Sequence, residues 1–133
     1  MTFNITAYEH VGIRVSERER SIRFYETLGW VEEIDLPEHH ANEMVNASGV
    51  YINLIFNGTS QQDAKNILQD DNVKYPGMTH AAFIVDDLQA LIKKLQQENI
   101  AITDGPHIYS NRRQLIFIRD PDGNVLEFNE ILE

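Results

Sequence analysis

A repeat with an offset of 70 residues is the feature that most limits how this chain can fold. The segment His10-Val-Gly-Ile-Arg-Val aligns with the segment His80-Ala-Ala-Phe-Ile-Val, and both are rich in residues that favour strands. A helix-start signal follows each segment at the same distance: Ser16 with Glu19 in the first half, Asp86 with Gln89 in the second. The two halves are therefore predicted to share one architecture.

Each helix-start signal is followed by a helical pattern and then by a helix-stop residue. The apolar residues recur at helical spacing in both halves: Ile22, Tyr25 and Leu28 in the first, and Leu88, Leu91, Ile92 and Leu95 in the second. Gly29 and Asn99 come next, again 70 residues apart, and both residue types tolerate the left-handed backbone that ends a helix.

Strand patterns fill the rest of each half. The predicted strands are 10–15, 30–36, 43–47 and 50–56, then 80–85, 100–103, 113–119 and 125–131. Asp120-Pro-Asp-Gly-Asn is a strong turn signal before the last strand. We therefore predict an α+β fold in which two βαβββ modules form a cupped mixed β-sheet. Residues 1–133 are expected to form a single domain, with modules at 1–57 and 78–133 and a linker at 58–77.

The composition excludes several classes of protein. A formal net charge of -10 argues against binding nucleic acid, because phosphates are bound mainly by clustered Lys and Arg. The chain has no Cys, which excludes disulfides and thiolate metal sites. No apolar run is long enough to cross a bilayer and the N-terminus lacks a signal-peptide pattern, so we expect a cytoplasmic protein without a membrane role.

Strand alternation places three possible metal ligands on equivalent faces. Val11, Ile13 and Val15 suit the face packed under the helix, which turns His10 to the other face. The same reasoning turns His80 away from the helix in the second half, and Glu127 in the last strand points the same way. Two His and one carboxylate with open coordination positions form a facial triad typical of divalent metal sites. A lone His in a strand is more often structural, but repeat-equivalent His residues on one kind of face favour a metal site.

Three stretches resemble the vicinal oxygen chelate superfamily, which contains glyoxalase I, fosfomycin-resistance enzymes, methylmalonyl-CoA epimerase, extradiol dioxygenases and bleomycin-binding proteins. The first runs from His10 through Ser21-Ile-Arg-Phe-Tyr to Leu28-Gly-Trp, the second is the segment that begins at His80, and the third is Phe117-Ile-Arg-Asp-Pro-Asp-Gly-Asn-Val-Leu-Glu-Phe. Together they cover nearly the whole chain. The resemblance implies the glyoxalase/bleomycin resistance/dihydroxybiphenyl dioxygenase fold.

The resemblance also implies one divalent ion (Zn, Ni, Mn, Fe or Co) held by the first and fourth strands of each unit. That pattern gives His10, His80 and Glu127 as ligands and Asn53 where four-ligand members carry Glu. A neutral amide is a weaker donor than a carboxylate, so a three-ligand site is expected. The implied function is a glyoxalase I-like lyase that binds vicinal oxygens of a small substrate, with Glu127 also moving a proton.

Several alternatives stay open at this point. The same triad serves ferrous dioxygenases and manganese fosfomycin transferases, and a drug-binding protein without catalysis is a third possibility. The sequence does not decide the substrate, a thiol cosubstrate, or whether the site is shared across the homodimer that the resemblance implies. Asn53 and the segment before strand 113–119 are weaker candidates for substrate contacts; the candidates in that segment are His107, Tyr109, Arg112 and Arg113. No organic cofactor is predicted.

Overall fold

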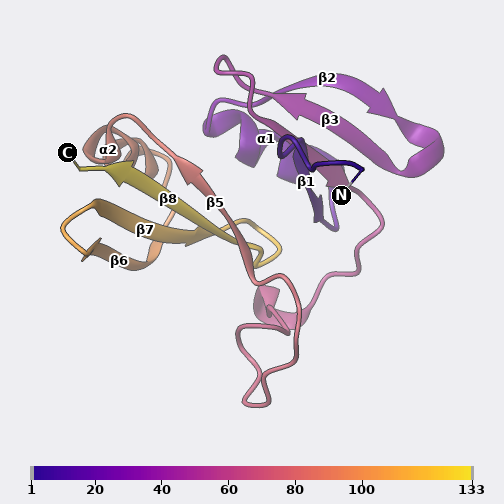
Figure 1. Cartoon of the computed structure of the whole chain (residues 1–133). Helices are drawn as coiled ribbons and strands as arrows, with labels where there is room; N and C mark the ends of the chain where they lie inside the picture. The colour runs from indigo at the N-terminus through magenta and orange to yellow at the C-terminus, as the bar shows by residue number, and fades with distance from the viewer. Residues whose placement is uncertain (1, 133) are drawn as a thin grey trace. The chain divides into compact units, whose positions relative to one another are not determined.

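The computed structural model describes residues 2–132. The chain divides into two units, with the boundary along the sequence between Thr59 and Ser60. Each unit has a four-stranded sheet and a ten-residue α-helix, which can be followed in Figure 1. Each unit has the predicted order of strand, helix and three strands. The prediction of two βαβββ modules with mixed sheets is therefore confirmed.

The first unit contains four strands and one α-helix. Its elements are β1 (His10–Arg14), α1 (Arg18–Thr27), β2 (Val31–Leu36), the 3-10 turn η1 (Pro37–His39), β3 (Ala41–Val45) and β4 (Tyr51–Ile55). The strand order is β1-β4-β3-β2, with β1 parallel to β4 and the other neighbours antiparallel. Apolar side chains fill its core: Ile13, Val15, Ile22, Tyr25, Trp30, Met44, Ile52 and Leu54.

The second unit repeats this arrangement. Its elements are the 3-10 turn η2 (Gln62–Ala64), β5 (His80–Ile84), α2 (Leu88–Gln97), β6 (Ile102–Tyr109), β7 (Arg113–Arg119) and β8 (Val125–Ile131). The strand order is β5-β8-β7-β6, again with the first and last strands parallel. Its core consists of Leu88, Leu95, Leu115, Ile116, Ile118, Leu126 and Phe128.

The helix ends agree with the sequence prediction at the C-terminal side and differ from it at the N-terminal side. The N-cap residues are Glu17 and Asp87, one residue later than predicted, and the Asp87 side chain accepts from the Ala90 N–H at 3.0 Å. Gly29 and Asn99 both take positive φ, as predicted, at 103° and 57°. The 70-residue offset therefore holds at both ends of each helix, although the predicted capping residues were wrong.

Residues 60–77 of the predicted linker are grouped with the second unit. The Asn66 side chain donates to the Gly123 carbonyl at 3.0 Å, which fastens this segment to the turn between β7 and β8. That turn is closed by Asp120, whose carboxylate accepts from the Asn124 N–H at 2.9 Å. Among residues 2–132, no helix is long and apolar enough to cross a membrane.

Candidate metal and substrate site

His80 and Glu127 face each other on neighbouring parallel strands of the second unit. His80 begins β5, and the pairing of Ala82 with Glu127 places both side chains on the sheet face opposite Leu126 and Phe128. His80 Nε2 lies 2.9 Å from Glu127 Oε1. The pair is part-buried, because the Glu127 side chain is only 10% exposed whereas the His80 side chain is 32% exposed. An imidazole and a carboxylate, two kinds of group that commonly bind divalent ions in proteins, thus lie within hydrogen-bonding distance of one another.

The remaining polar atoms of this pair are also held. The Thr79 hydroxyl lies 2.8 Å from His80 Nδ1, and the Asn129 amide donates to Glu127 Oε2 at 2.7 Å. The Phe117 ring meets the imidazole edge to face with 5.4 Å between centroids. The imidazole and the carboxylate are therefore held on several sides.

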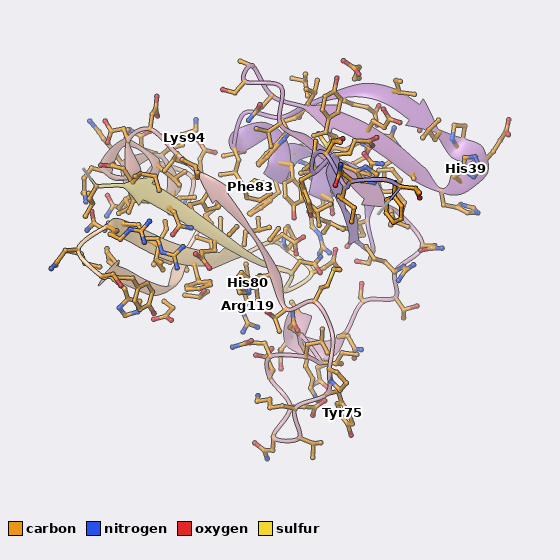
Figure 2. All side chains as sticks on the ribbon, viewed as in Figure 1. His39, Tyr75, His80, Phe83, Lys94 and Arg119 are labelled. Carbon is orange, nitrogen blue, oxygen red and sulfur yellow. The ribbon has the colours of Figure 1, made fainter. Side chains whose placement is uncertain are left out.

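A cleft of about 330 Å³ opens beside His80 within the second unit. Its walls combine Thr79, Gln69 and Thr103 with the apolar ring of Phe117 and with Arg119. Figure 2 shows His80 and Arg119 on the same side of this unit. The cleft is large enough for a small polar substrate next to the imidazole.

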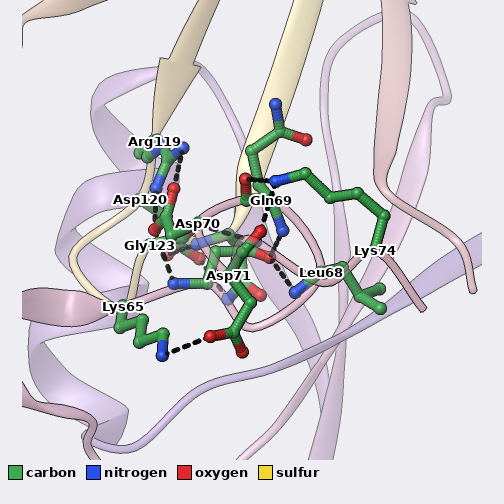
Figure 3. A network of polar contacts seen from close by, with 11 residues as sticks. Lys65, Leu68, Gln69, Asp70, Asp71, Lys74, Arg119, Asp120 and Gly123 are labelled. Carbon is green, nitrogen blue, oxygen red and sulfur yellow. Dashed lines mark hydrogen bonds and ion pairs between the residues drawn. The ribbon is translucent and has the colours of Figure 1, made fainter.

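An ion pair between Arg119 and Asp70 supports the cleft wall (Figure 3). The two guanidinium–carboxylate distances are 2.7 and 2.8 Å, which is the strong bidentate arrangement. The hydrogen bonds from Arg119, helped by the Asn66 N–H at 2.8 Å, hold the pKa of Asp70 well below its usual range. The same hydrogen bonds raise the pKa of Arg119. This guanidinium is therefore already neutralised by a carboxylate.

His10 lies at the equivalent place at the start of β1 in the first unit. Its Nδ1 is 2.7 Å from Oε1 of Glu9, and because a carboxylate only accepts, Nδ1 is the donor of this contact. Asn53 pairs with Gly12 at the position where Glu127 pairs with Ala82. Asn53 is half-buried on β4, whereas Glu127 is buried on β8.

The three predicted ligands lie in two units. Among residues 2–132, the structure gathers no group of three or more His, Asp or Glu side chains able to hold a metal ion. It brings His80 and Glu127 together in the second unit, while His10 belongs to the first. The structure thus brings together two of the three side chains of the predicted triad.

The four weaker substrate candidates around the β6–β7 turn are not among the residues that line the cleft, although His107 contacts one that is, Asp104. His107 binds the Asp104 carboxylate at 2.7 Å, and the Arg113 guanidinium lies 5.9 Å from the centre of the Tyr109 ring. The Arg112 N–H donates to the Tyr109 carbonyl at the turn between the two strands. These four residues form an exposed group at the tip of the β6–β7 hairpin.

Sequence reasoning missed the side chains that surround His80. Thr79 directly precedes a predicted ligand, and Asn129 follows Glu127 by two residues on the same strand face, so both were accessible to the alternation argument. Gln69 carried no such signal, because it lies in a segment without periodicity. Its place in the cleft depends on how residues 60–78 pack.

The comparisons with known proteins agree with this architecture. A profile of the Glyoxalase/Bleomycin resistance protein/Dioxygenase superfamily matches residues 7–128. The chain is 29% identical over 127 residues to a protein of Bacillus subtilis (strain 168) named "Probable trivalent organoarsenical cleaving enzyme", covering 91% of this chain and 77% of that protein. It is 28% identical over 127 residues to "Metallothiol transferase FosB" of Lysinibacillus sphaericus (strain C3-41), covering 94% and 82%.

A solved structure shows the same fold. The crystal structure of a glyoxalase/dioxygenase from Nostoc punctiforme superimposes with a TM-score of 0.73 at 18% identity, covering 99% of this chain and all of that one. The profile match spans most of the chain and includes His10, His80 and Glu127. The chain belongs to the Glyoxalase/Bleomycin resistance protein/Dioxygenase superfamily.

Proposed function

We propose that this protein is a metal-dependent enzyme that binds two neighbouring oxygen atoms of a small substrate on one divalent ion. His80 and Glu127 would hold the ion together with His10, which comes from this chain or from a second copy. The observation that carries the proposal is the 2.9 Å approach of His80 Nε2 to Glu127 Oε1 beside the cleft.

The donor set fits such an ion. Two imidazoles and one carboxylate are accepted by Zn, Ni, Mn, Fe and Co and leave coordination positions open. The Glu9 carboxylate at 2.7 Å from His10 Nδ1 supports His10 as the third donor, because a ligating His commonly donates its other ring N–H to a carboxylate. When bound, the ion would supply a Lewis acid with a residual charge of about +1, suited to an enediolate-like or other anionic oxygen pair.

The chain's own groups would position the substrate and move a proton. Thr103 and Gln69 offer hydrogen bonds along the cleft, and Phe117 offers an apolar surface. Glu127 is the buried carboxylate of the site and is our candidate for accepting and returning a proton at a carbon next to a carbonyl. This role matches a glyoxalase I-like lyase.

A second candidate is transfer of a thiol to an electrophile, favoured by the FosB relative that matches 94% of this chain. Both reactions would use the same His, His and Glu site and would differ in the substrate. The relative named for organoarsenical cleavage adds a third substrate class to be assayed.

Metal content and a substrate panel test the proposal in sequence. The protein is purified from metal-supplemented culture, and bound ions are counted by mass spectrometry. We expect about one ion per chain, followed by turnover of methylglyoxal–thiol adducts. If the protein instead turns over fosfomycin with a thiol, a catechol, or a trivalent organoarsenical, that substrate would assign thiol transfer, dioxygenase or organoarsenical-cleaving activity, respectively. If the purified protein contains no stoichiometric ion and no added ion binds, the protein would be a small-molecule binding protein without metal chemistry.

We also propose a homodimer. Each sheet has two edge strands, β1 and β2 in one unit and β5 and β6 in the other, and uncovered edges are usually shielded in native proteins. Light scattering after gel filtration should give twice the chain mass of 15.3 kDa. A mass of one chain at micromolar concentration contradicts this.

A further inference from the structure

Two side chains that no prediction assigned hold the outer atoms of the His80–Glu127 pair. The Thr79 hydroxyl is 2.8 Å from His80 Nδ1, and the Asn129 amide nitrogen is 2.7 Å from Glu127 Oε2. Each contact occupies the atom that faces away from the partner. Only Nε2 and Oε1 are left facing each other at 2.9 Å.

Asn129 is an unusual residue for the place it occupies. It is 4% exposed, and its Oδ1 has no hydrogen-bond partner among the residues that the structure describes. A carboxylate oxygen only accepts, so the amide nitrogen must face Glu127 and the unpaired oxygen must face elsewhere. A buried acceptor without a partner costs free energy. Packing alone therefore does not account for an Asn here.

The first unit provides an internal comparison for Asn129. Ile55 pairs with Arg14 as Asn129 pairs with Ile84. Both residues also accept a hydrogen bond through their backbone carbonyls at 2.8 Å, from the residue that follows β1 or β5. The fold thus accommodates an aliphatic residue at this position. The polar side chain occurs in the unit that carries Glu127.

The same comparison applies to Thr79. Glu9 precedes His10 as Thr79 precedes His80, and each residue contacts Nδ1 of the following imidazole, at 2.7 and 2.8 Å. A hydroxyl can donate to or accept from Nδ1, so Thr79 suits the imidazole as a donor to Glu127 and as a ligand of a cation. Both units therefore hold the imidazole from the preceding residue.

We propose that Thr79 and Asn129 are positioning residues that direct His80 Nε2 and Glu127 Oε1 toward a shared divalent ion. This inference rests on the proposed function. Side chains that hold ligands from behind typically change metal affinity about 10- to 100-fold when removed. An ion shared by His80 and Glu127 would account for both side chains being held in this way.

Metal affinity of variants tests this directly. The apoprotein of each variant competes with a chromophoric chelator for Zn²⁺ and, separately, for Co²⁺. Thr79→Val, Asn129→Leu and Asn129→Val are each expected to weaken binding about 10- to 100-fold. Thr79→Ser, which keeps the hydroxyl, should bind within about threefold of the wild type.

Matched controls separate positioning from general effects of substitution. Thr27→Val removes another exposed hydroxyl that makes one hydrogen bond, to the Arg23 carbonyl at 3.0 Å. Ile55→Val alters the strand position equivalent to Asn129. Both controls should bind Zn²⁺ and Co²⁺ as the wild type does. Circular dichroism checks the folding of each variant. The two side chains introduced at Asn129 differ in shape, so that metal affinity can still be measured on one variant if the other does not fold.

The outcomes distinguish the two proposals. If the wild type binds an ion and the Thr79→Val and Asn129 variants bind it equally well, the positioning role is overturned and the proposed function stands. A Thr79→Ser variant that binds the ion as weakly as Thr79→Val would overturn the role of the hydroxyl. A wild type that binds none of Zn²⁺, Ni²⁺, Mn²⁺, Fe²⁺ and Co²⁺ would overturn the proposed function and this inference with it.

Discussion

Asn53 occupies in the first unit the position that Glu127 occupies in the second. Asn53 pairs with Gly12 across β4 and β1, and Glu127 pairs with Ala82 across β8 and β5, in the same parallel alignment. The two units thus keep one backbone arrangement and differ in charge at this point. An amide offers a neutral oxygen, so the asymmetry favours three ligands over four.

Replacing Asn53 tests the number of ligands. Asn53→Ala should change divalent-ion affinity less than about threefold, because a neutral amide adds little to two imidazoles and a carboxylate. His80→Ala, which removes a direct donor, is the comparison. Isothermal titration with Mn²⁺ measures both. Equal losses of affinity in the two variants would make Asn53 a ligand.

The Asp70–Arg119 ion pair should contribute to stability in a pH-dependent way. Asp70→Asn removes a bidentate pair of partly exposed side chains, so we expect the free energy of unfolding to fall by about 1 kcal/mol at pH 7. The Arg119 hydrogen bonds lower the pKa of Asp70 in the folded chain from its ordinary value of 3.8. The contribution is therefore full above that value and lost as the pH falls further.

Urea unfolding at pH 7 and pH 3 measures this difference. The gap between wild type and Asp70→Asn should shrink at the lower pH. Asp71→Asn is the control, because the nearby Asp71 carboxylate accepts a hydrogen bond from Lys65 at 2.8 Å and does not form a bidentate pair. A gap that stays constant or widens toward pH 3 would refute the assigned role of the ion pair.

Gly123 should be far less replaceable than Gly49. Both have positive φ, 86° and 77°, but a Cβ on Gly123 would collide with the Ala64 carbonyl oxygen while one on Gly49 would meet no atom within 4 Å. Gly49→Ala should cost about 1–2 kcal/mol from backbone strain alone. Gly123→Ala should cost about 2–3 kcal/mol. Chemical denaturation compares them, and equal losses would disprove the close approach of residues 64–66 to the turn.

The elements that follow strong local patterns could be predicted from the sequence. Ile13 and Val15 are buried while His10 is exposed, as alternation along a strand requires. Gly29 and Asn99 end their helices because few other residues accept positive φ cheaply. These features depend on residues close together in the sequence, so the sequence alone is enough to predict them.

Other features depend on packing that the sequence does not show. Asp86 and Asp87 are both good N-cap residues, and only the observed contact with the Ala90 N–H selects Asp87. The sixth strand reaches from Ile102 to Tyr109, beyond the predicted 100–103, although it contains Gly105 and Pro106. Pairing with β7, interrupted by two irregularities, extends it despite these residues.

The pairing of Asp70 with Arg119 lies between residues 49 positions apart, and no local signal indicates it. The contact lies at the wall of the cleft beside His80, because Arg119 and Gln69, the neighbour of Asp70, both line it. Prediction from the sequence therefore reached the imidazole and the carboxylate but not the wall around them.

Equilibrium dialysis of the apoprotein against Zn²⁺, Ni²⁺, Mn²⁺, Fe²⁺ and Co²⁺, the iron arm without oxygen, tests the central claim most directly. The wild type should bind about one of these ions per chain, and His80→Ala and Glu127→Ala should each bind it at least about 100-fold more weakly, since each removes a donor. The account is contradicted if the wild type takes up none of the five stoichiometrically, or if both variants bind as tightly as the wild type does.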